Sequence, residues 1–168
     1  EMVPLPFSSC FIDDCIKVGK DIQNGGAKFS TNFIMPVGMV DFGNSMAAIK
    51  KLVFEEKKFT LKELRAALEA NFEGEANKEI QSLCLDAPKY GKDNDYVDSI
   101  VKQFYDFFIR EHASQEDLFG FVTHPEAYSV STHNLHGMIC AATPNGRKAG
   151  MPFTDATVSA TPGTDRSG

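Results

Sequence analysis

The stretch from residue 128 to residue 155 constrains the fold more than any other part of the chain. Polar and apolar residues alternate over residues 128–132, with the period of a β-strand. Residues 135–142 are almost continuously apolar, as expected for a strand that is covered on both faces. Residues 143–146 then read TPNG, a turn in which proline presets φ and Asn-Gly accepts positive φ. Because α/β proteins often place sites where a buried strand ends in a polar turn, we expect a functional region here.

The spacing of apolar residues elsewhere predicts a helical scaffold. Helices are expected over residues 7–19, 41–56, 60–74, 75–85 and 95–112, and a short strand within residues 27–37. The faces predicted to be buried are Phe11, Cys15 and Val18; Phe42, Met46, Ile49 and Val53; Leu61, Leu64, Leu68 and Phe72; and Val97, Ile100, Val101, Phe104, Phe107 and Phe108. The clearest local signal is a capping box, in which Thr60 and Glu63 each bond the other's backbone amide.

So few strands cannot make a sheet that is covered on both faces unless further strands join them. The sequence therefore predicts part of an α/β barrel or sheet better than a closed domain. Its 42% hydrophobic content is enough to bury a core in 168 residues.

Charge and cysteine content narrow the class of protein. A net charge of −6 argues against nucleic acid or an anionic membrane as a partner. The four cysteines, at positions 10, 15, 84 and 140, form no CxxC pair and read as reduced thiols of an intracellular protein. No apolar run approaches the length of a membrane span. The expected location is the cytoplasm.

His133 and His136 are three residues apart, a spacing that resembles that of metal ligands on a helix. Residues three apart on a strand point to opposite faces, and no third ligand lies nearby in the sequence. No metal site is expected. His133 is expected to face a polar interior, and a structural histidine with satisfied hydrogen bonds is the alternative.

Several blocks occur in a characteristic order. They read DCIKVGKDIQNGGAKF (residues 14–29), SMAAIKKLVF (45–54), ANFEG (70–74), LDAPKYGKDNDYVD (85–98), ATPNGRKAGMPFTD (142–155) and PGTDRSG (162–168). Together they resemble glycyl-radical enzymes of the pyruvate formate-lyase family over essentially the whole chain. They look more like the broad group of dehydratases, decarboxylases, C–N lyases and fumarate-adding synthases than pyruvate formate-lyase itself.

The resemblance implies a fold and a place in a larger enzyme. Catalytic subunits of this family are ten-stranded α/β barrels wrapped by helices, with the active site inside. Residues 1–168 would be a partial catalytic barrel domain, an internal segment that supplies some of the wall. The parent enzyme is expected to be a homodimer, and its partners would be the rest of the subunit, a small-molecule substrate and an activating enzyme. That activating enzyme would use S-adenosylmethionine and an iron–sulfur cluster to install the glycyl radical.

Both reacting residues are expected outside this chain. The family carries its radical cysteine in Gly-Cys-Val-Glu or a close variant, and its radical glycine in Arg-Val-x-Gly-Tyr. Neither motif occurs in the sequence. The resemblance places the cysteine loop before residue 1 and the glycyl loop after residue 168, so no catalytic residue and no bound cofactor are assigned within residues 1–168.

Four residues are candidates for the substrate pocket. By resemblance, Tyr128, Ser129, Ser131 and His133 lie on a strand that leads into the barrel. Alternate residues share a face, and the polar set of Ser129, Ser131 and His133 is favoured because a pocket needs a few placed donors. Hydroxyls paired with the backbone in a core are the equally plausible alternative.

The turn Asn145-Gly146-Arg147 has two possible roles. Arg147 could grip a carboxylate or phosphate with its bidentate fork, or it could pin the turn to a carboxylate such as Asp155. The resemblance places this turn throughout a family with unrelated substrates, which favours the structural role.

The predicted function is therefore a segment of a glycyl-radical enzyme that uses a thiyl radical to abstract hydrogen from a small organic substrate. The reaction could be a C–C, C–O or C–N cleavage, a decarboxylation, a dehydration or an addition to fumarate. One alternative is a stand-alone, non-catalytic scaffold or partner subunit related to the barrel. A small enzyme that uses His133 with Cys140 is disfavoured, because seven residues of extended chain separate the two side chains.

Overall fold

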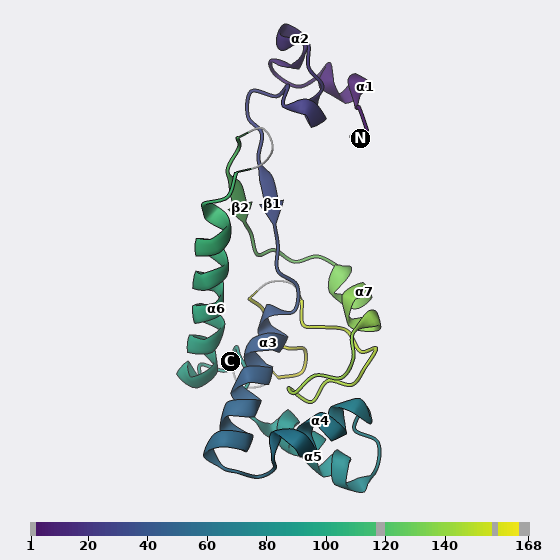
Figure 1. Cartoon of the computed structure of the whole chain (residues 1–168), viewed down its shortest axis with the longest axis vertical. Coiled ribbons are helices and arrows are strands. Elements are labelled where there is room, and N and C mark those ends of the chain that lie inside the picture. The colour runs from purple at the N-terminus through teal and green to yellow at the C-terminus, as the bar shows by residue number, and fades with distance from the viewer. Residues whose placement is uncertain (1–2, 117–119, 156–157, 165–168) are drawn as a thin grey trace. The chain divides into compact units, whose positions relative to one another are not determined.

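A computed structural model describes residues 3–116, 120–155 and 158–164. The chain divides into two compact units, the first formed by Glu1–Ile34 with Phe108–Glu126, the second by Met35–Phe107 with Ala127–Gly168. Figure 1 shows the helices and strands of both units. The sequence block at residues 162–168 lies partly outside the described residues.

The first unit begins with short helical turns in place of the single helix that the sequence predicts over residues 7–19. These are α1 (Pro6–Ser9), α2 (Cys15–Val18) and a 3-10 turn (Ile22–Asn24). Asp14 takes a left-handed φ of 73°, which a continuous helix cannot contain. The Asp21 carboxylate accepts hydrogen bonds from Leu5 N at 2.7 Å and Ser9 Oγ at 3.0 Å, and so folds the segment back on itself.

The predicted apolar face of this segment is consequently wrong in part. Cys15 is buried, but Phe11 is 73% exposed and Val18 51% exposed. Among the described residues, the strands form one two-stranded sheet of β1 (Asn32–Ile34) and β2 (Thr123–Pro125), which pair in parallel. The predicted strand within residues 27–37 is confirmed as a short one. No strand was predicted at β2.

The second unit is mostly helical. Its elements are α3 (Met39–Ala48), a π-helical continuation (Ile49–Glu55), α4 (Leu61–Glu69), α5 (Glu75–Asp86) and α7 (Thr132–Ile139). The long helix α6 (Asp95–Ala113) contributes its residues up to Phe107 to this unit. One core cluster joins Ala48, Leu52, Phe59, Leu64, Cys84 and Ala87, and a second joins Ala47, Val97 and Val101. Helices α5 and α6 confirm the prediction from the sequence.

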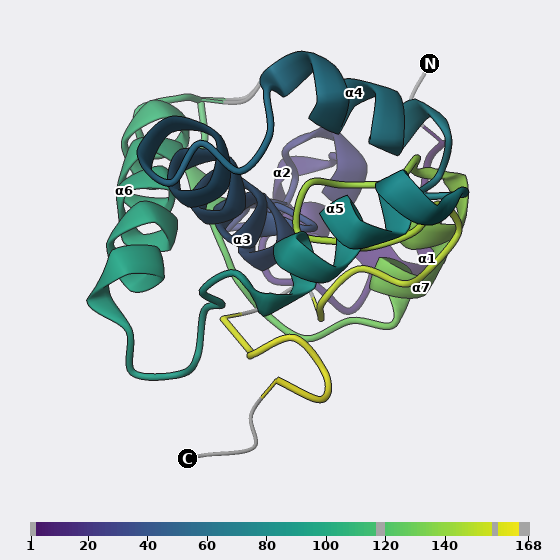
Figure 2. The same cartoon turned by 90° about the horizontal axis from the view of Figure 1, so that it is seen from below.

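Helix α3 buries a different face from the one predicted. Phe42 is 39% exposed and Met46 is 41% exposed, whereas Asp41, Asn44 and Ser45 are buried with the small residues around them. The reason is that α3 makes polar contacts with the C-terminal segment and with the loop between α5 and α6. Asn44 Nδ2 donates to Thr161 Oγ1 at 3.1 Å, and its Oδ1 accepts from Tyr90 N at 2.7 Å. Figures 1 and 2 show this segment, in yellow-green, passing α3 and α5.

Helix α4 confirms the predicted capping box. Thr60 Oγ1 accepts from Glu63 N at 3.2 Å, and Glu63 Oε2 accepts from Thr60 N at 2.7 Å. Leu64 and Phe72 are buried as predicted, but Leu61 is exposed. The helix ends before the predicted Gly74, because Asn71 and Phe72 take positive φ values of 50° and 59°.

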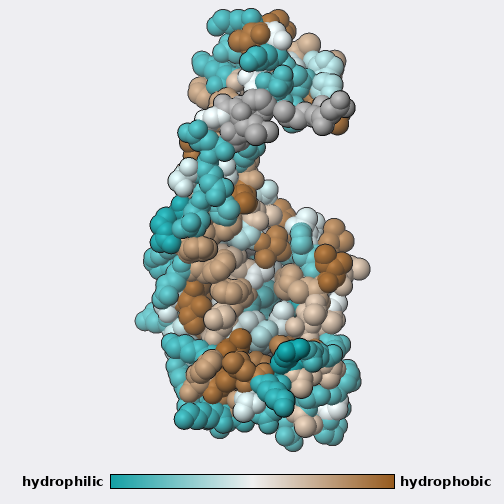
Figure 3. Space-filling model, viewed as in Figure 1, coloured by the Kyte–Doolittle hydropathy of each residue, from teal (hydrophilic) through white to brown (hydrophobic). Residues whose placement is uncertain are grey.

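The predicted strand at residues 128–142 is wrong. Residues 128–131 have no regular secondary structure, and α7 follows them. Leu135, Met138 and Ile139 fall three and four residues apart, which is the spacing of one helical stripe, and all three are exposed. Figure 3 shows this hydrophobic surface over α7.

Of the predicted inward residues of α6, Val97 and Val101 are buried but Phe107 is exposed.

Candidate functional site

The four predicted pocket residues lie at the start of α7 and in the segment before it. Tyr128, Ser129 and Ser131 are exposed, and His133, in the first turn of the helix, is partly buried. Ser129 Oγ donates to the Asp155 carboxylate. Because these residues are not on a strand, the predicted alternation of faces no longer sorts them.

His133 contacts the main chain through one ring nitrogen. Its Nδ1 lies 2.7 Å from the carbonyl oxygen of Val130. A carbonyl can only accept, so Nδ1 carries the hydrogen and the neutral ring presents Nε2 as an acceptor. His136 makes the same kind of bond to the Thr132 carbonyl at 2.8 Å. In the described part of the chain, no group of three or more His, Cys, Asp or Glu side chains is arranged to hold a metal ion.

Helix α7 also bears on the alternative enzyme that would use His133 with Cys140. His133 lies in the first turn, whereas Cys140 is the C-cap residue. Seven residues of α-helix span roughly 10 Å. The two side chains are therefore too far apart for direct proton transfer, as expected, although the segment is helical and not extended.

Residues 143–147 form a closed turn. Gly146 N donates to Thr143 O at 3.0 Å, and Thr143 N donates to Arg147 O at 2.9 Å. Asn145 Oδ1 accepts from Thr143 Oγ1 at 2.6 Å and from Arg147 N at 3.2 Å. Gly146 has a φ of 95°, and a Cβ there would lie 2.7 Å from Leu85 Cγ, so the turn requires glycine twice over.

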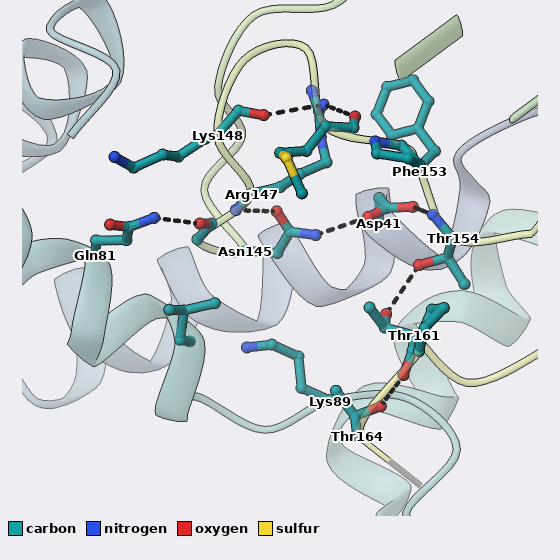
Figure 4. Close-up of a pocket in the computed structure, with 15 residues that line it drawn as sticks. Asp41, Gln81, Lys89, Asn145, Arg147, Lys148, Phe153, Thr154, Thr161 and Thr164 are labelled. Carbon is teal, nitrogen blue, oxygen red and sulfur yellow. Dashed lines mark hydrogen bonds between the residues drawn. The ribbon is translucent and has the colours of Figure 1, made fainter. Parts of the chain in front are cut away.

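A buried carboxylate on α3 anchors this turn. Asp41 Oδ1 accepts from Asn145 Nδ2 at 2.9 Å, and Asp41 Oδ2 accepts from Thr154 N at 2.7 Å (Figure 4). Burial raises the pKa of Asp41, while hydrogen bonds from Thr154 and Asn145 and the positive charge of Arg147 oppose that rise. The sequence placed Asp41 only at the start of a helix, because its partners lie more than 100 positions away.

Arg147 is buried beside the C-terminal end of α7. Its guanidinium donates to main-chain carbonyl oxygens, those of Gly137, Cys140, Ala141, Lys148 and Met151. Its Nε donates to Thr143 Oγ1 at 3.2 Å, and its Cζ lies 4.4 Å from the centre of the Phe153 ring. Asp155, the partner suggested by the sequence, instead accepts from Ser129.

The same turn is tied to the α4–α5 region. Gln81 Nε2 donates to Gly146 O at 3.0 Å, and Ala149 N donates to Asn71 Oδ1 at 2.8 Å. Lys148 pairs with Glu73 at 3.0 Å, an exposed ion pair that lowers the pKa of Glu73. The turn is therefore held by contacts from several elements of the second unit.

A cavity of about 540 Å³ lies beside the turn. The residues that line it include Asp41, Gln81, Lys89, Asn145, Arg147 and Thr161 (Figure 4). Tyr128, Ser129, Ser131 and His133 do not line this cavity. The predicted turn residues and the predicted pocket residues therefore occupy different places in the unit.

Lys89 is a buried cation that the sequence did not single out. Its Nζ donates to Cys84 O at 2.6 Å and to Ala87 O at 3.0 Å, at the C-terminal end of α5. Burial lowers the pKa of Lys89 to about 8 and raises the pKa of Cys84 to about 11. Because a cation at this position satisfies carbonyls that the helix leaves unpaired, Lys89 acts as a cap of α5.

The comparisons with known proteins identify the family. A family model described as "Pyruvate formate lyase-like" matches residues 1–137. The chain belongs to this family. It is 37% identical over 99% of its length to the trans-4-hydroxy-L-proline dehydratase of Clostridioides difficile, and 34% identical over 92% to the 4-hydroxyphenylacetate decarboxylase glycyl radical subunit of the same species.

A solved structure agrees with these sequence relatives. A solved structure described as "1,2-propanediol Dehydration in Roseburia inulinivorans" superimposes on this chain with a TM-score of 0.89. The two sequences are 39% identical, and the match covers 99% of this chain and 22% of that chain. The chain spans about a fifth of the length of the relatives it matches. The prediction that these residues form part of a glycyl-radical-type α/β barrel is confirmed. No helix among the described residues is long and apolar enough to cross a membrane.

Proposed function

We propose that the chain is an internal segment of the catalytic subunit of a glycyl-radical enzyme that acts on a small organic substrate. The observation that carries this proposal is the match over 99% of the chain, at 39% identity, to a solved structure of 1,2-propanediol dehydration. In this function the radical glycine lies beyond residue 168 and the thiyl-forming cysteine before residue 1. A separate activating enzyme installs the radical, and the subunit forms a homodimer.

The first activity to test is dehydration. The trans-4-hydroxy-L-proline dehydratase and the structure named for 1,2-propanediol dehydration share 37% and 39% of residues with this chain. A barrel suits radical chemistry because it excludes water and holds the thiyl radical and the substrate in contact. The chain would contribute wall and pocket residues to that barrel, and neither reacting residue.

Ser131 and His133 are the pocket residues that we favour. The Nδ1–H of His133 is used by the Val130 carbonyl, so Nε2 can accept a hydrogen bond from a substrate hydroxyl. Ser131 lies at the N-cap of the same helix, with an exposed side chain. Ser129 is weaker support because its hydroxyl already donates to Asp155, and Tyr128 precedes both in an irregular segment.

The test uses the protein encoded by the complete reading frame, activated without oxygen. Glycyl radical yield is measured by electron paramagnetic resonance, and turnover is measured on a panel of small diols, hydroxyproline and arylacetates. Ser131→Ala and His133→Ala should lower turnover while the radical yield stays at the wild-type level. His136→Ala is the matched control, because His136 makes the same kind of main-chain bond one turn along α7.

Two results would contradict the proposal. A wild-type protein that gains no glycyl radical and turns over no substrate would favour the non-catalytic scaffold. Equal loss of radical yield and turnover in His133→Ala would mean that the residue serves folding.

A further inference from the structure

The side chain of Arg147 donates hydrogen bonds to main-chain carbonyl oxygens at the C-terminal end of α7. Guanidinium Nη1 lies 3.4 Å from Gly137 O, in the last turn of the helix, and Nη2 lies 3.5 Å from Cys140 O and also donates to Ala141 O. The last carbonyls of a helix have no partner within it. Gly137 O also accepts from Cys140 N at 3.2 Å and Cys140 O from Gly150 N at 3.3 Å, and Arg147 adds charged donors to these carbonyls and to Ala141 O.

The same guanidinium also bonds the segment after the turn, which has no regular secondary structure. Nη1 donates to Met151 O at 2.5 Å and to Lys148 O at 3.2 Å. The Phe153 ring packs against the guanidinium, and Phe153 N donates to His133 O at 3.3 Å. Contacts from residues 147–153 thus reach α7 both at its C-terminal end and in its first turn.

Gly137 makes this contact close. A Cβ at this position would lie 2.4 Å from Met151 O and 2.6 Å from Pro152 Cα. Neither atom is the movable end of a side chain, so α7 can approach residues 151–153 this closely only with glycine here. At Gly137 the backbone of α7 therefore lies directly against the backbone of residues 151–153.

The bonds of the Arg147 guanidinium go mainly to main-chain carbonyl oxygens, and its positive charge also acts on the buried Asp41 carboxylate. Among the ion pairs of residues 3–116, 120–155 and 158–164, none includes Arg147. A cation at a helix C-terminus is favoured by the macrodipole. A planar guanidinium can serve carbonyls on two sides at once, whereas the ammonium of lysine is a compact point donor.

We propose that Arg147 is a positioning residue, which fixes α7 against residues 147–153 and thereby places His133 and Ser131 for reaction. This role rests on the proposed function, since it takes those two side chains to face the substrate. Arg147 itself would touch neither the substrate nor the radical.

The experiment uses the complete, activated enzyme with Arg147→Ala and Arg147→Lys. Lys148→Ala is the matched control, because this neighbouring cation pairs with exposed Glu73 and, among the residues that the structure describes, its side chain makes no hydrogen bond to α7. Four quantities are measured: hydrogen exchange of the α7 amides, glycyl radical yield, and both kcat and KM for the substrate found by turnover screening. Millimolar guanidinium ion is then added to Arg147→Ala.

The expected result separates position from folding. Loss of charge-assisted bonds should speed exchange in α7 by about 10- to 100-fold while exchange in α5 is unchanged. The value of kcat should fall by about 10- to 100-fold, because small misplacements of reacting groups are costly, while radical yield stays at the wild-type level. Guanidinium ion should restore part of kcat, and Arg147→Lys should not.

A second variant keeps the proposal testable if Arg147→Ala does not fold. Gly137→Ala leaves Arg147 in place but pushes α7 away from Met151 and Pro152. It should lower kcat with radical yield retained, and guanidinium ion should not rescue it. An equal loss in Lys148→Ala would overturn the proposal.

Other outcomes would also overturn it. These are unchanged α7 exchange in Arg147→Ala, faster exchange with unchanged kcat, and loss of radical yield in step with kcat. Failure of the proposed function looks different, because the wild-type enzyme would then show no glycyl radical before any variant is compared.

Discussion

The bond between Asn145 and Asp41 is the contact whose removal should most disturb the turn. Both residues are buried, and Asn145 Nδ2 lies 2.9 Å from Asp41 Oδ1. A hydrogen bond to a charged group contributes about 1.5–3 kcal/mol. Asn145 also accepts bonds from Thr143 and from Arg147 N, each worth about 1 kcal/mol. Asn145→Ala should therefore lower the free energy of opening the turn by about 3–5 kcal/mol.

A double-mutant cycle isolates the interaction energy between Asn145 and Asp41. Asn145→Ala, Asp41→Ala and the double variant are compared by hydrogen exchange at Thr154 and Arg147, whose amides bond these two side chains. We expect a coupling energy of about 1.5–3 kcal/mol. Gln81→Ala is the control, because Gln81 also bonds the turn but reaches Gly146 O. A coupling below about 0.5 kcal/mol between Asn145 and Asp41 would refute the reasoning.

Three further predictions concern helix ends and the turn. Thr60→Ala should lower the stability of α4 by about 1 kcal/mol through loss of the capping box, and unchanged exchange in α4 would contradict this. Gly146→Ala should destabilise the turn by about 2 kcal/mol or more, because its φ is 95° and Leu85 leaves no room for a Cβ; exchange at Arg147 N measures it. Lys89 has a folded pKa of about 8 against 10.5 unfolded, so the unfolded chain binds more protons between these values and stability should rise with pH there. Because Cys84 works in the opposite direction, the measurement is the difference between wild type and Lys89→Met across that window, and no difference would contradict it.

Local signals in the sequence predicted local structure well. The capping box needs only Thr60 and Glu63, and it is present as predicted. The turn at residues 143–146 needs only Pro, Asn and Gly, and the chain turns there. Helix α6 has a long, strongly periodic segment, which is the most dependable kind of signal.

The errors came where tertiary contacts decide. A short apolar run reads equally as a buried strand or a helix, and residues 135–139 proved helical. The buried face of α3 was missed because periodicity counts apolar residues, whereas Asp41 and Asn44 are buried by polar partners far along the chain. A three-residue strand such as β2 leaves no pattern to read.

In the candidate site, too, contiguous residues were predicted from the sequence and distant partners were not. Asn145, Gly146 and Arg147 stood out because the turn motif is contiguous. Their partners on α3, α5 and α7 could not be found from spacing. Lys89 gave no signal, because nothing in the sequence distinguishes a lysine that caps a buried helix end from a solvated one.

The most direct test of the proposed function is electron paramagnetic resonance on the complete protein after anaerobic activation. The expected spectrum is a doublet, because an electron on a glycine Cα couples to the one hydrogen that remains there. The doublet and substrate turnover should persist when Cys10, Cys15, Cys84 and Cys140 are each changed to serine. An activated protein without an organic radical, or loss of the radical or of turnover in any of these variants, would contradict the assignment of this chain as a wall that hosts neither reacting residue.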